Sequence, residues 1–134
     1  MIKIHDGSLT DAELLRYSRH IMLDQFDLEG QNKLNAAHVI VVGCGGLGMA
    51  ALPLLAGAGI GKITLIDFDI VDITNLHRQT GYQMQDVGLS KVQQAAKHLQ
   101  ALNPNIILEI IEQKVTFSQL ETIVAGASSV LDCS

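Results

Sequence analysis

The sequence predicts an α/β fold: a doubly wound, mainly parallel sheet between two layers of helices, with an extra helix at the N-terminus. Short apolar runs alternate with amphipathic segments from residue 38 onward, and a glycine-rich turn follows the first run. This order is Rossmann-like. We expect one domain over residues 1–134, with the N-terminal helix at about 8–24 and the Rossmann-like core at about 37–134.

The N-terminal segment carries the start signals of a helix. Ser8 or Thr10 can cap it, and Glu13 can return a hydrogen bond from the third helical position. Apolar residues then recur with helical spacing up to Met22. We expect one amphipathic helix here, followed by a polar link up to residue 37.

Strands and helices are expected in strict alternation after this link. The strands are short apolar runs, and the helices begin or end at Gly, Ser or Pro. We expect strands at 38–43, 62–67, 105–111 and 128–133, helices at about 46–58, 90–102 and 118–124, and no regular element over 68–89. Right-handed crossovers would make the sheet parallel and place ligands at the carboxyl ends of its strands.

Composition narrows the class of protein. The chain has 134 residues, of which 48% are hydrophobic, enough for a buried core without disulfides. Its net charge of −5 argues against nucleic acid as a partner. No run approaches the roughly 18 apolar residues of a membrane span, and the N-terminus is acidic, unlike a signal peptide. We expect a cytoplasmic protein that binds no membrane.

The cysteines and histidines do not predict a metal site. Cys44 and Cys133 make neither a disulfide framework nor a zinc-binding pair, and free thiols suit a reducing compartment. Both are expected to fill small apolar spaces. The histidines are scattered without metal-ligand spacing.

The strongest local signal is GCGGLG at 43–48, between a predicted strand and a predicted helix. Gly43 would permit the tight turn, Gly45 would let the backbone approach a phosphate, and Gly48 would let helix and strand pack closely. Gly46 begins the helix, whose free amides favour an anion. The alternative is a glycine-rich turn without a ligand.

Two acids follow the second predicted strand. Asp67 lies 19 residues after Gly48, close to the spacing expected for a carboxylate that binds ribose hydroxyls. Asp69 lies on the same side if the chain is extended, and it would either help to hold magnesium or be a solvated acid. These residues suit NAD and ATP equally well.

A polar segment further along favours ATP. Asn75, Arg78 and Gln79 lie just past the strand end, where a loop can fold over the site. Lys91 lies in the first turn of a helix, where a cation opposes the macrodipole unless an anion is near. A triphosphate could use both cations; the alternative is a solvated surface.

Five ordered motifs resemble the MoeB/ThiF/HesA family, which shares its fold with ubiquitin-activating enzymes. They are RYSRH at 16–20, GCGGLG at 43–48, DFD at 67–69, NLHRQT at 75–80 and GLSK at 88–91. The resemblance covers the chain from about Asp11 to Ser134 and is greatest to the members that act in molybdenum-cofactor and thiamine biosynthesis.

The resemblance implies an adenylyltransferase that uses ATP and Mg²⁺. The C-terminal Gly-Gly carboxylate of a ubiquitin-like sulfur carrier, MoaD- or ThiS-like, would attack the α-phosphate and form an acyl-adenylate. Asp67 would bind the ribose, and Asn75, Arg78 and Lys91 would hold the phosphates. Arg19 would reach the site of the partner subunit in a homodimer.

The sequence also departs from the family. Members are roughly twice as long, and the resemblance places a magnesium-binding aspartate just beyond Ser134 and structural zinc cysteines further on, which this sequence lacks. We therefore expect a truncated chain with a largely complete nucleotide pocket, and its activity on its own is left open. The alternatives are an NAD-binding oxidoreductase domain and a catalytically inactive scaffold or dimerisation fragment.

Overall fold

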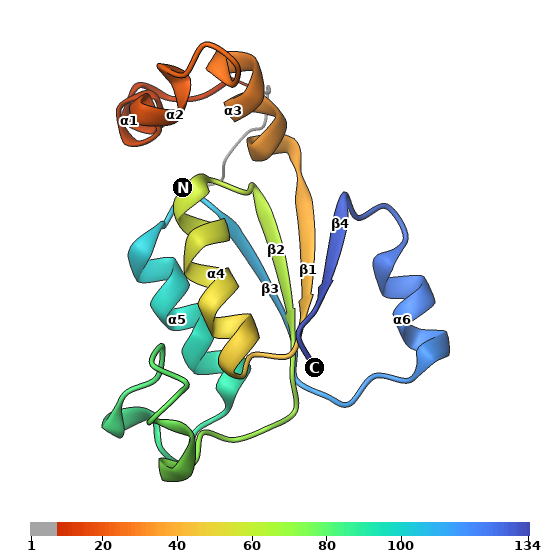
Figure 1. The fold of residues 1–134 in the computed structure, drawn as a ribbon. Helices are drawn as coiled ribbons and strands as arrows, with labels where there is room; N and C mark the ends of the chain where they lie inside the picture. Colours follow the sequence, from red (N-terminus) through yellow and green to blue (C-terminus); the bar gives the residue numbers. More distant parts are fainter. Residues whose placement is uncertain (1–7) are drawn as a thin grey trace.

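The computed structural model describes residues 8–134. Within this range the chain forms one sheet of parallel strands in the order β3-β2-β1-β4 (Figure 1). The strands are β1 (His38–Val42), β2 (Lys62–Ile66), β3 (Ile107–Ile111) and β4 (Ser129–Asp132). All four coincide with predicted strands to within two residues at either end.

Helices cover both faces of the sheet. Helices α4 (Gly46–Ala58) and α5 (Lys91–Leu102) lie on one face, and α6 (Phe117–Val124) lies on the other (Figure 1). The predicted three-layer, doubly wound fold is therefore confirmed. Within the described residues, no helix is long and apolar enough to cross a membrane.

The strand register brings three loops to one edge of the sheet. Val42 at the end of β1 is level with Ile66 of β2 on one side and with Asp132 of β4 on the other. The residues that follow these strands therefore meet at the carboxyl edge. The chain also reverses its direction of winding here, since β2 and β3 lie on one side of β1 and β4 lies on the other.

The N-terminal region differs from the single helix expected at 8–24. The structure has α1 (Asp11–Arg16), α2 (Ser18–Ile21) and α3 (Asp27–Ala36). The predicted start is confirmed: the Thr10 hydroxyl accepts a hydrogen bond from the Glu13 amide, and the Glu13 carboxylate accepts one from the Thr10 amide. The helix stops at Tyr17, whose side chain turns into the core and whose hydroxyl accepts a hydrogen bond from Asn103.

Helix α3 replaces the predicted polar link. Its sequence, DLEGQNKLNA, has few apolar residues, so no helical periodicity signalled it. A polar residue anchors the helix instead. Gln31 is fully buried, and its side chain donates to the Ala58 carbonyl at the end of α4 and contacts the His20 ring nitrogen at 3.0 Å.

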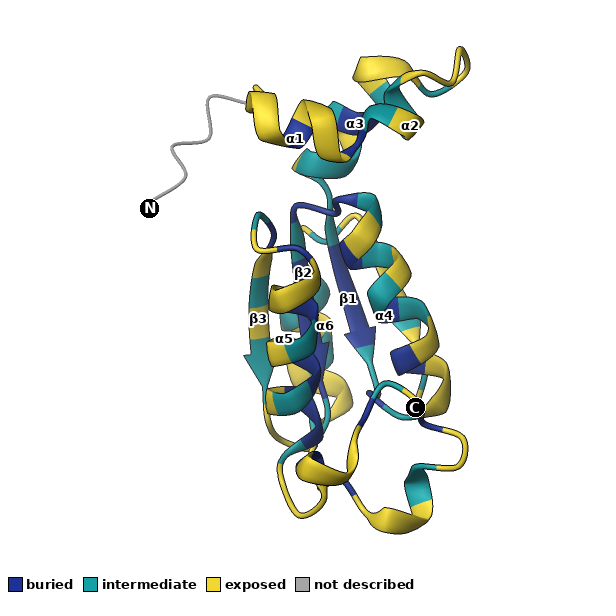
Figure 2. Ribbon diagram, turned by 90° about the vertical axis from the view of Figure 1, so that its left-hand side faces the viewer, coloured by how far each residue is buried: buried dark blue, intermediate teal, exposed yellow. Residues whose placement is uncertain are grey.

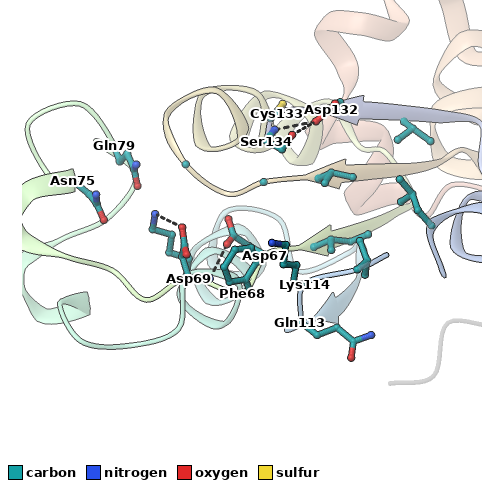
Figure 3. A pocket seen from close by; sticks show the side chains of 18 of the residues that line it. Asp67, Phe68, Asp69, Asn75, Gln79, Gln113, Lys114, Asp132, Cys133 and Ser134 are labelled. Carbon is teal, nitrogen blue, oxygen red and sulfur yellow. Dashed lines mark hydrogen bonds and ion pairs between the residues drawn. The ribbon is translucent and has the colours of Figure 1, made fainter. Parts of the chain in front are cut away.

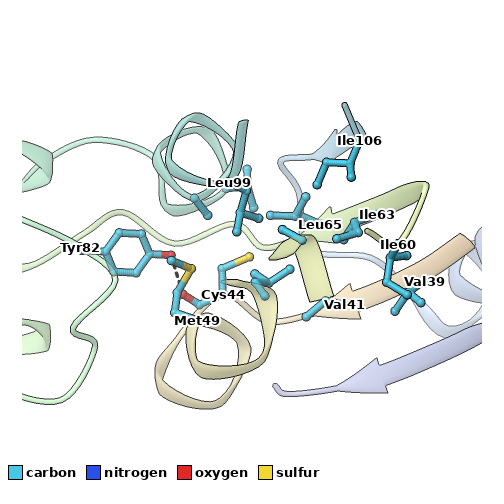
Figure 4. Packing of buried hydrophobic residues seen from close by; sticks show 14 of the residues in the cluster. Val39, Val41, Cys44, Met49, Ile60, Ile63, Leu65, Tyr82, Leu99 and Ile106 are labelled. Atoms are coloured by element: carbon cyan, nitrogen blue, oxygen red, sulfur yellow. Dashed lines mark hydrogen bonds between the residues drawn. The ribbon is translucent and has the colours of Figure 1, made fainter. Parts of the chain in front are cut away.

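The main core lies between the sheet and the helices α4 and α5. Val39, Val41, Ile63 and Leu65 point to this side from β1 and β2 and pack against both helices (Figure 4). The edge strands β3 and β4 are more exposed than the two central strands (Figure 2). The core therefore holds β1 and β2 rigidly, and with them the loops that follow these strands.

Candidate functional site

A cleft of about 700 Å³ opens at the carboxyl edge of the sheet (Figure 3). Residues that end or follow all four strands line it, and the segment 68–90, which follows β2, forms one wall. Most of the residues predicted for the site line this cleft: Gly43, Gly45, Asp67, Asp69, Asn75, Arg78, Gln79 and Lys91. The topology thus brings together residues that are widely separated in the sequence.

The glycine loop has the conformation that its sequence predicts. Gly43 has a φ of +96°, and a Cβ placed there would lie 2.6 Å from the Cys133 carbonyl oxygen. A Cβ on Gly48 would lie 1.9 Å from the Gly43 carbonyl oxygen. The tight turn and the close helix packing are therefore present, and ligand binding by the loop stays a prediction.

The start of α4 is left open to a ligand. The N-cap residue is Gly45, so no side chain forms a capping hydrogen bond with the first amides of the helix. The first turn also carries no acidic residue. Free amides at a helix start attract anions, and Gly45 lines the cleft beside them. Gly46 is exposed and Gly48 is buried, and neither is among the residues that line the cleft.

The glycine loop and the loop after β2 are joined through Asp67. One oxygen of its carboxylate accepts a hydrogen bond from the Cys44 amide at 2.7 Å, and the other accepts one from the Asp69 amide at 2.8 Å. These bonds fix the orientation of the carboxylate. A carboxylate has about four acceptor positions, so Asp67 can still accept hydroxyl donors from a ligand.

The first helical turn of α5 presents a buried lysine to the cleft. The Lys91 side chain is only 6% exposed, and its Nζ lies 3.6 Å from an Asp69 carboxylate oxygen. This burial rules out the alternative of a solvated surface lysine. Asp69 is the acidic partner of Lys91 in this ion pair. Its side chain is 54% exposed, and both residues line the cleft.

The segment 72–79 places three polar side chains on the wall, and two of them, Asn75 and Gln79, are labelled in Figure 3. The side-chain oxygen Oδ1 of Asn75 accepts a hydrogen bond from the Asp72 amide, which caps the 3₁₀ turn Ile73–Asn75. Arg78 is exposed and donates to the Thr74 carbonyl. Gln79 is buried, and its side-chain oxygen has no hydrogen-bond partner. A buried polar atom left in this way is costly unless a ligand or water satisfies it.

Sequence reasoning missed part of the cleft. Phe68, Gln113, Lys114 and the segment 132–134 also line it, and the Lys114 ammonium lies 5.9 Å from the centre of the Phe68 ring. Residues 113 and 114 follow β3, and 132–134 end and follow β4. The rule that ligands bind at the carboxyl ends of parallel strands could have identified both groups.

Arg19 is placed far from the cleft of its own chain. It is exposed on α2, and helices α1 to α3 lie at the amino end of β1, opposite the glycine loop (Figure 2). Arg19 is not among the residues that line the cleft. A role for Arg19 in the site of another subunit stays a prediction.

The buried Cys44 does not have the surroundings of a nucleophile. Burial, reinforced by the Asp67 carboxylate, raises the pKa of the fully buried Cys44 thiol to about 12. Cys133 packs against the same core, which agrees with the expected filler role. Among residues 8–134, no group of three or more His, Cys, Asp or Glu side chains could hold a metal ion.

Comparison with known sequences agrees with these features. The profile of the ThiF family matches residues 17–134. The chain is 47% identical over 128 residues to the molybdopterin-synthase adenylyltransferase of Salmonella typhimurium, covering 96% of this chain and 51% of that protein. It is 42% identical to the ThiS adenylyltransferase of Escherichia coli, covering 94% and 50%. The chain thus spans about half the length of the curated relatives it matches.

Solved structures show the same fold. The E. coli tRNA N6-threonylcarbamoyladenosine dehydratase TcdA, solved with ATP, superposes with a TM-score of 0.87 at 33% identity, over 95% of this chain and 52% of that one. E. coli MccB with ATP superposes with a TM-score of 0.71 at 34% identity, over 80% and 33%. Both of these similar proteins were crystallised with ATP, the nucleotide that the polar segment 75–79 and Lys91 favour.

Proposed function

Because the chain belongs to the ThiF family, we propose that it is the nucleotide-binding part of an adenylyltransferase that uses ATP to activate a ubiquitin-like sulfur carrier. The cleft, with the buried Lys91 at its wall, is the observation that carries this proposal. A buried ammonium group is costly unless anions lie close to it. The Asp69 carboxylate is half exposed, and its nearer oxygen lies 3.6 Å from the Lys91 Nζ. The phosphates of ATP would complete its surroundings.

The reaction that we propose is an in-line displacement at the α-phosphate. The C-terminal carboxylate of the carrier attacks the phosphorus, the bond to the β-phosphate oxygen breaks, and pyrophosphate leaves. The product is an acyl-adenylate, and no side chain of the enzyme forms a covalent bond. Positive and hydrogen-bonding groups therefore supply the catalysis, by stabilising charge on the phosphate oxygens.

In this reaction, the predicted residues that line the cleft have the following roles. Asp67, already oriented by two backbone amides, accepts the ribose hydroxyls. The glycine loop and the start of α4 face the phosphates. Arg78 and Lys91 neutralise phosphate charge, with Asn75 donating from its amide nitrogen and Gln79 adjoining Gly45.

Magnesium, a homodimer and the identity of the carrier also belong to the proposal. Mg²⁺ is usually held by one or two carboxylates together with nucleotide phosphates, and Asp69 is a carboxylate in the cleft. The carrier would be MoaD- or ThiS-like, since the relatives include adenylyltransferases of both pathways. A cytoplasmic location is proposed from the free thiols and the composition.

Ligand-dependent thermal stability tests the nucleotide assignment. Mg-ATP at a hundredfold excess over its Kd should stabilise the 134-residue chain by about 2.7 kcal/mol, or a rise in Tm of roughly 10 °C. NAD should give no comparable rise. Arg78→Ala and Lys91→Ala should each lose most of the ATP-induced rise, measured against the ligand-free Tm of the same variant.

Lys97→Ala is the matched control, because Lys97 is an exposed lysine of the same helix outside the cleft. This variant should keep the full response to ATP. Stabilisation by NAD alone would replace the proposal with an NAD-binding oxidoreductase domain. No response to either nucleotide, together with self-association, would favour an inactive scaffold.

A further inference from the structure

A buried tyrosine on the core side of the cleft connects its wall to the glycine loop. Tyr82 lies in the segment 68–90 and is only 4% exposed. Its hydroxyl donates to the Cys44 carbonyl oxygen at 2.5 Å (Figure 4). The Lys91 carbonyl lies 3.4 Å from the same hydroxyl, beyond the usual range of an O–H···O bond, so Cys44 is the acceptor that fixes the proton.

The carbonyl that Tyr82 holds belongs to the peptide between Cys44 and Gly45. A trans peptide is planar, and its N–H points opposite to its C=O; the described residues contain no cis peptide. Tyr82 belongs to the core cluster under the loop, while Gly45 lines the cleft above it. With the carbonyl held toward the core, the Gly45 amide is directed toward the cleft.

Other contacts hold the two peptides that flank this one. The Cys44 amide donates to Asp67, and the Gly45 carbonyl accepts the first hydrogen bond of α4, from Met49. Among the hydrogen bonds of the described residues, none uses the Gly45 amide as donor. A glycine has no Cβ to hinder rotation of its peptide, so the Tyr82 hydroxyl is the group that fixes this amide.

We propose that Tyr82 is a positioning residue for nucleotide binding, which holds the Cys44–Gly45 peptide so that the Gly45 amide donates to a phosphate of the nucleotide. This inference rests on the proposed function, since it assumes that the cleft binds ATP. It extends that function to a residue outside the cleft. It also explains why the wall segment that carries Asn75, Arg78 and Gln79 contacts the glycine loop.

The protonation state of Tyr82 suits this role. Burial, with the nearby Cys44, Asp67 and Asp86, raises the pKa of the Tyr82 hydroxyl above its ordinary value. The hydroxyl therefore stays protonated at neutral pH, and it remains a donor. Replacement by phenylalanine keeps the ring and removes only this donor.

The test compares Tyr82→Phe with Tyr17→Phe in the 134-residue chain, by NMR titration with Mg-ATP and with adenosine. Tyr17 is the other tyrosine of the sequence, is 3% exposed, and also loses a buried hydroxyl hydrogen bond, with Asn103. Tyr82→Phe should weaken Mg-ATP binding on the order of tenfold, the effect of one lost hydrogen bond. Adenosine, which has no phosphate, should bind Tyr82→Phe as it binds the wild type. Tyr17→Phe should bind both ligands like the wild type.

The outcomes separate this inference from the proposed function. If the wild type does not bind Mg-ATP, both are overturned. If the wild type binds and Tyr82→Phe binds equally well, the inference alone is overturned. Equal weakening of ATP and adenosine would indicate a general structural role and would overturn it too.

A second measurement does not depend on the folding of a variant. In the wild type, the Gly45 amide proton should shift strongly on addition of Mg-ATP and much less on addition of adenosine. Absence of an ATP-dependent shift at Gly45, while other cleft residues respond, would overturn the inference.

Discussion

At the scale of single residues, Gly48 is required because backbone atoms occupy the space of a side chain. A Cβ there would lie 1.9 Å from the Gly43 carbonyl oxygen, and neither group can move without shifting the turn or the helix. Gly48→Ala should therefore destabilise the protein by about 1–3 kcal/mol. Urea unfolding measures the change.

Gly57 in the same helix provides a control, for which we expect the change in stability to have the opposite sign. A Cβ at Gly57 meets no atom within 4 Å. Gly57→Ala should stabilise by about 0.5–1 kcal/mol, since alanine loses less backbone entropy than glycine when a helix forms. A Gly48→Ala variant as stable as Gly57→Ala would contradict the packing described here.

Single residues were predictable where their type alone imposes the role. Gly43 and Gly48 fall in this class, because a side chain at either position would collide with the backbone, and glycine adopts the φ of +96° at Gly43 without strain. The burial of Lys91 beside Asp69 was not predictable from spacing. That burial depends on the path of the loop between β2 and α5, which no local sequence pattern predicts. Lys114 was missed although it follows a predicted strand, because no glycine or acidic motif marks that strand's end.

At the scale of elements, the wall segment 68–90 is attached to α5 through a buried acid. Asp86 is 2% exposed; its carboxylate contacts the His98 ring nitrogen at 2.9 Å and accepts a hydrogen bond from the Gln83 amide. Burial alone would raise the pKa of Asp86, but the bonds from His98 and Gln83 bring it below its ordinary value of 3.8.

The sign of the shift gives a pH dependence. The carboxylate of Asp86 stabilises the fold fully above pH 3.8, and this contribution is lost as the pH falls through the lower pKa of the folded state. Asp86→Asn should cost about 1–2 kcal/mol at pH 7. It should also lose less stability than the wild type between pH 4 and acid unfolding, by urea unfolding at several pH values.

Asp24→Asn serves as the control for removing a carboxylate, because Asp24 is an exposed acid outside this pair. It should follow the wild-type pH profile. An Asp86→Asn variant with the acid sensitivity of the wild type would show that the pair does not couple to folding.

Elements were predictable in proportion to their apolar pattern. The strands and the helices α4, α5 and α6 carry continuous or periodic apolar residues, and each was placed to within two residues at its ends. Helix α3 was missed because a buried glutamine anchors it, and a polar residue gives no such pattern. Residues 68–89 were left without regular structure, and apart from two 3₁₀ turns and an isolated bridge between Ile70 and Ser90 this holds.

At the scale of the whole molecule, the N-terminal helices and the cleft lie at opposite ends of β1. Five extended residues span roughly 17 Å at about 3.3 Å per residue, more than an arginine side chain can bridge. The exposed Arg19 of α2 therefore cannot contact a nucleotide in its own cleft. If it contributes to binding, as the family resemblance implies, it does so in a second copy of the chain.

Mixing two variants tests this arrangement. Arg19→Ala and Lys91→Ala should each impair Mg-ATP binding, because each removes one cation from every site of the proposed homodimer. In an equal mixture that exchanges subunits freely, half of the dimers are mixed, and one of their two sites keeps both residues. About one quarter of all sites should then bind ATP normally, as two-fold symmetry requires.

Arg16→Ala is the matched control, since Arg16 is an exposed arginine of the neighbouring helix α1 that donates to the Leu102 carbonyl of its own chain. This variant should bind Mg-ATP like the wild type. Binding stoichiometry and sedimentation of the same samples report recovery and dimerisation together. Recovery in the mixture requires that Arg19 and Lys91 of different chains serve one site. Normal binding by Arg19→Ala, or a dimeric mixture without recovery, would show that Arg19 acts in no such site.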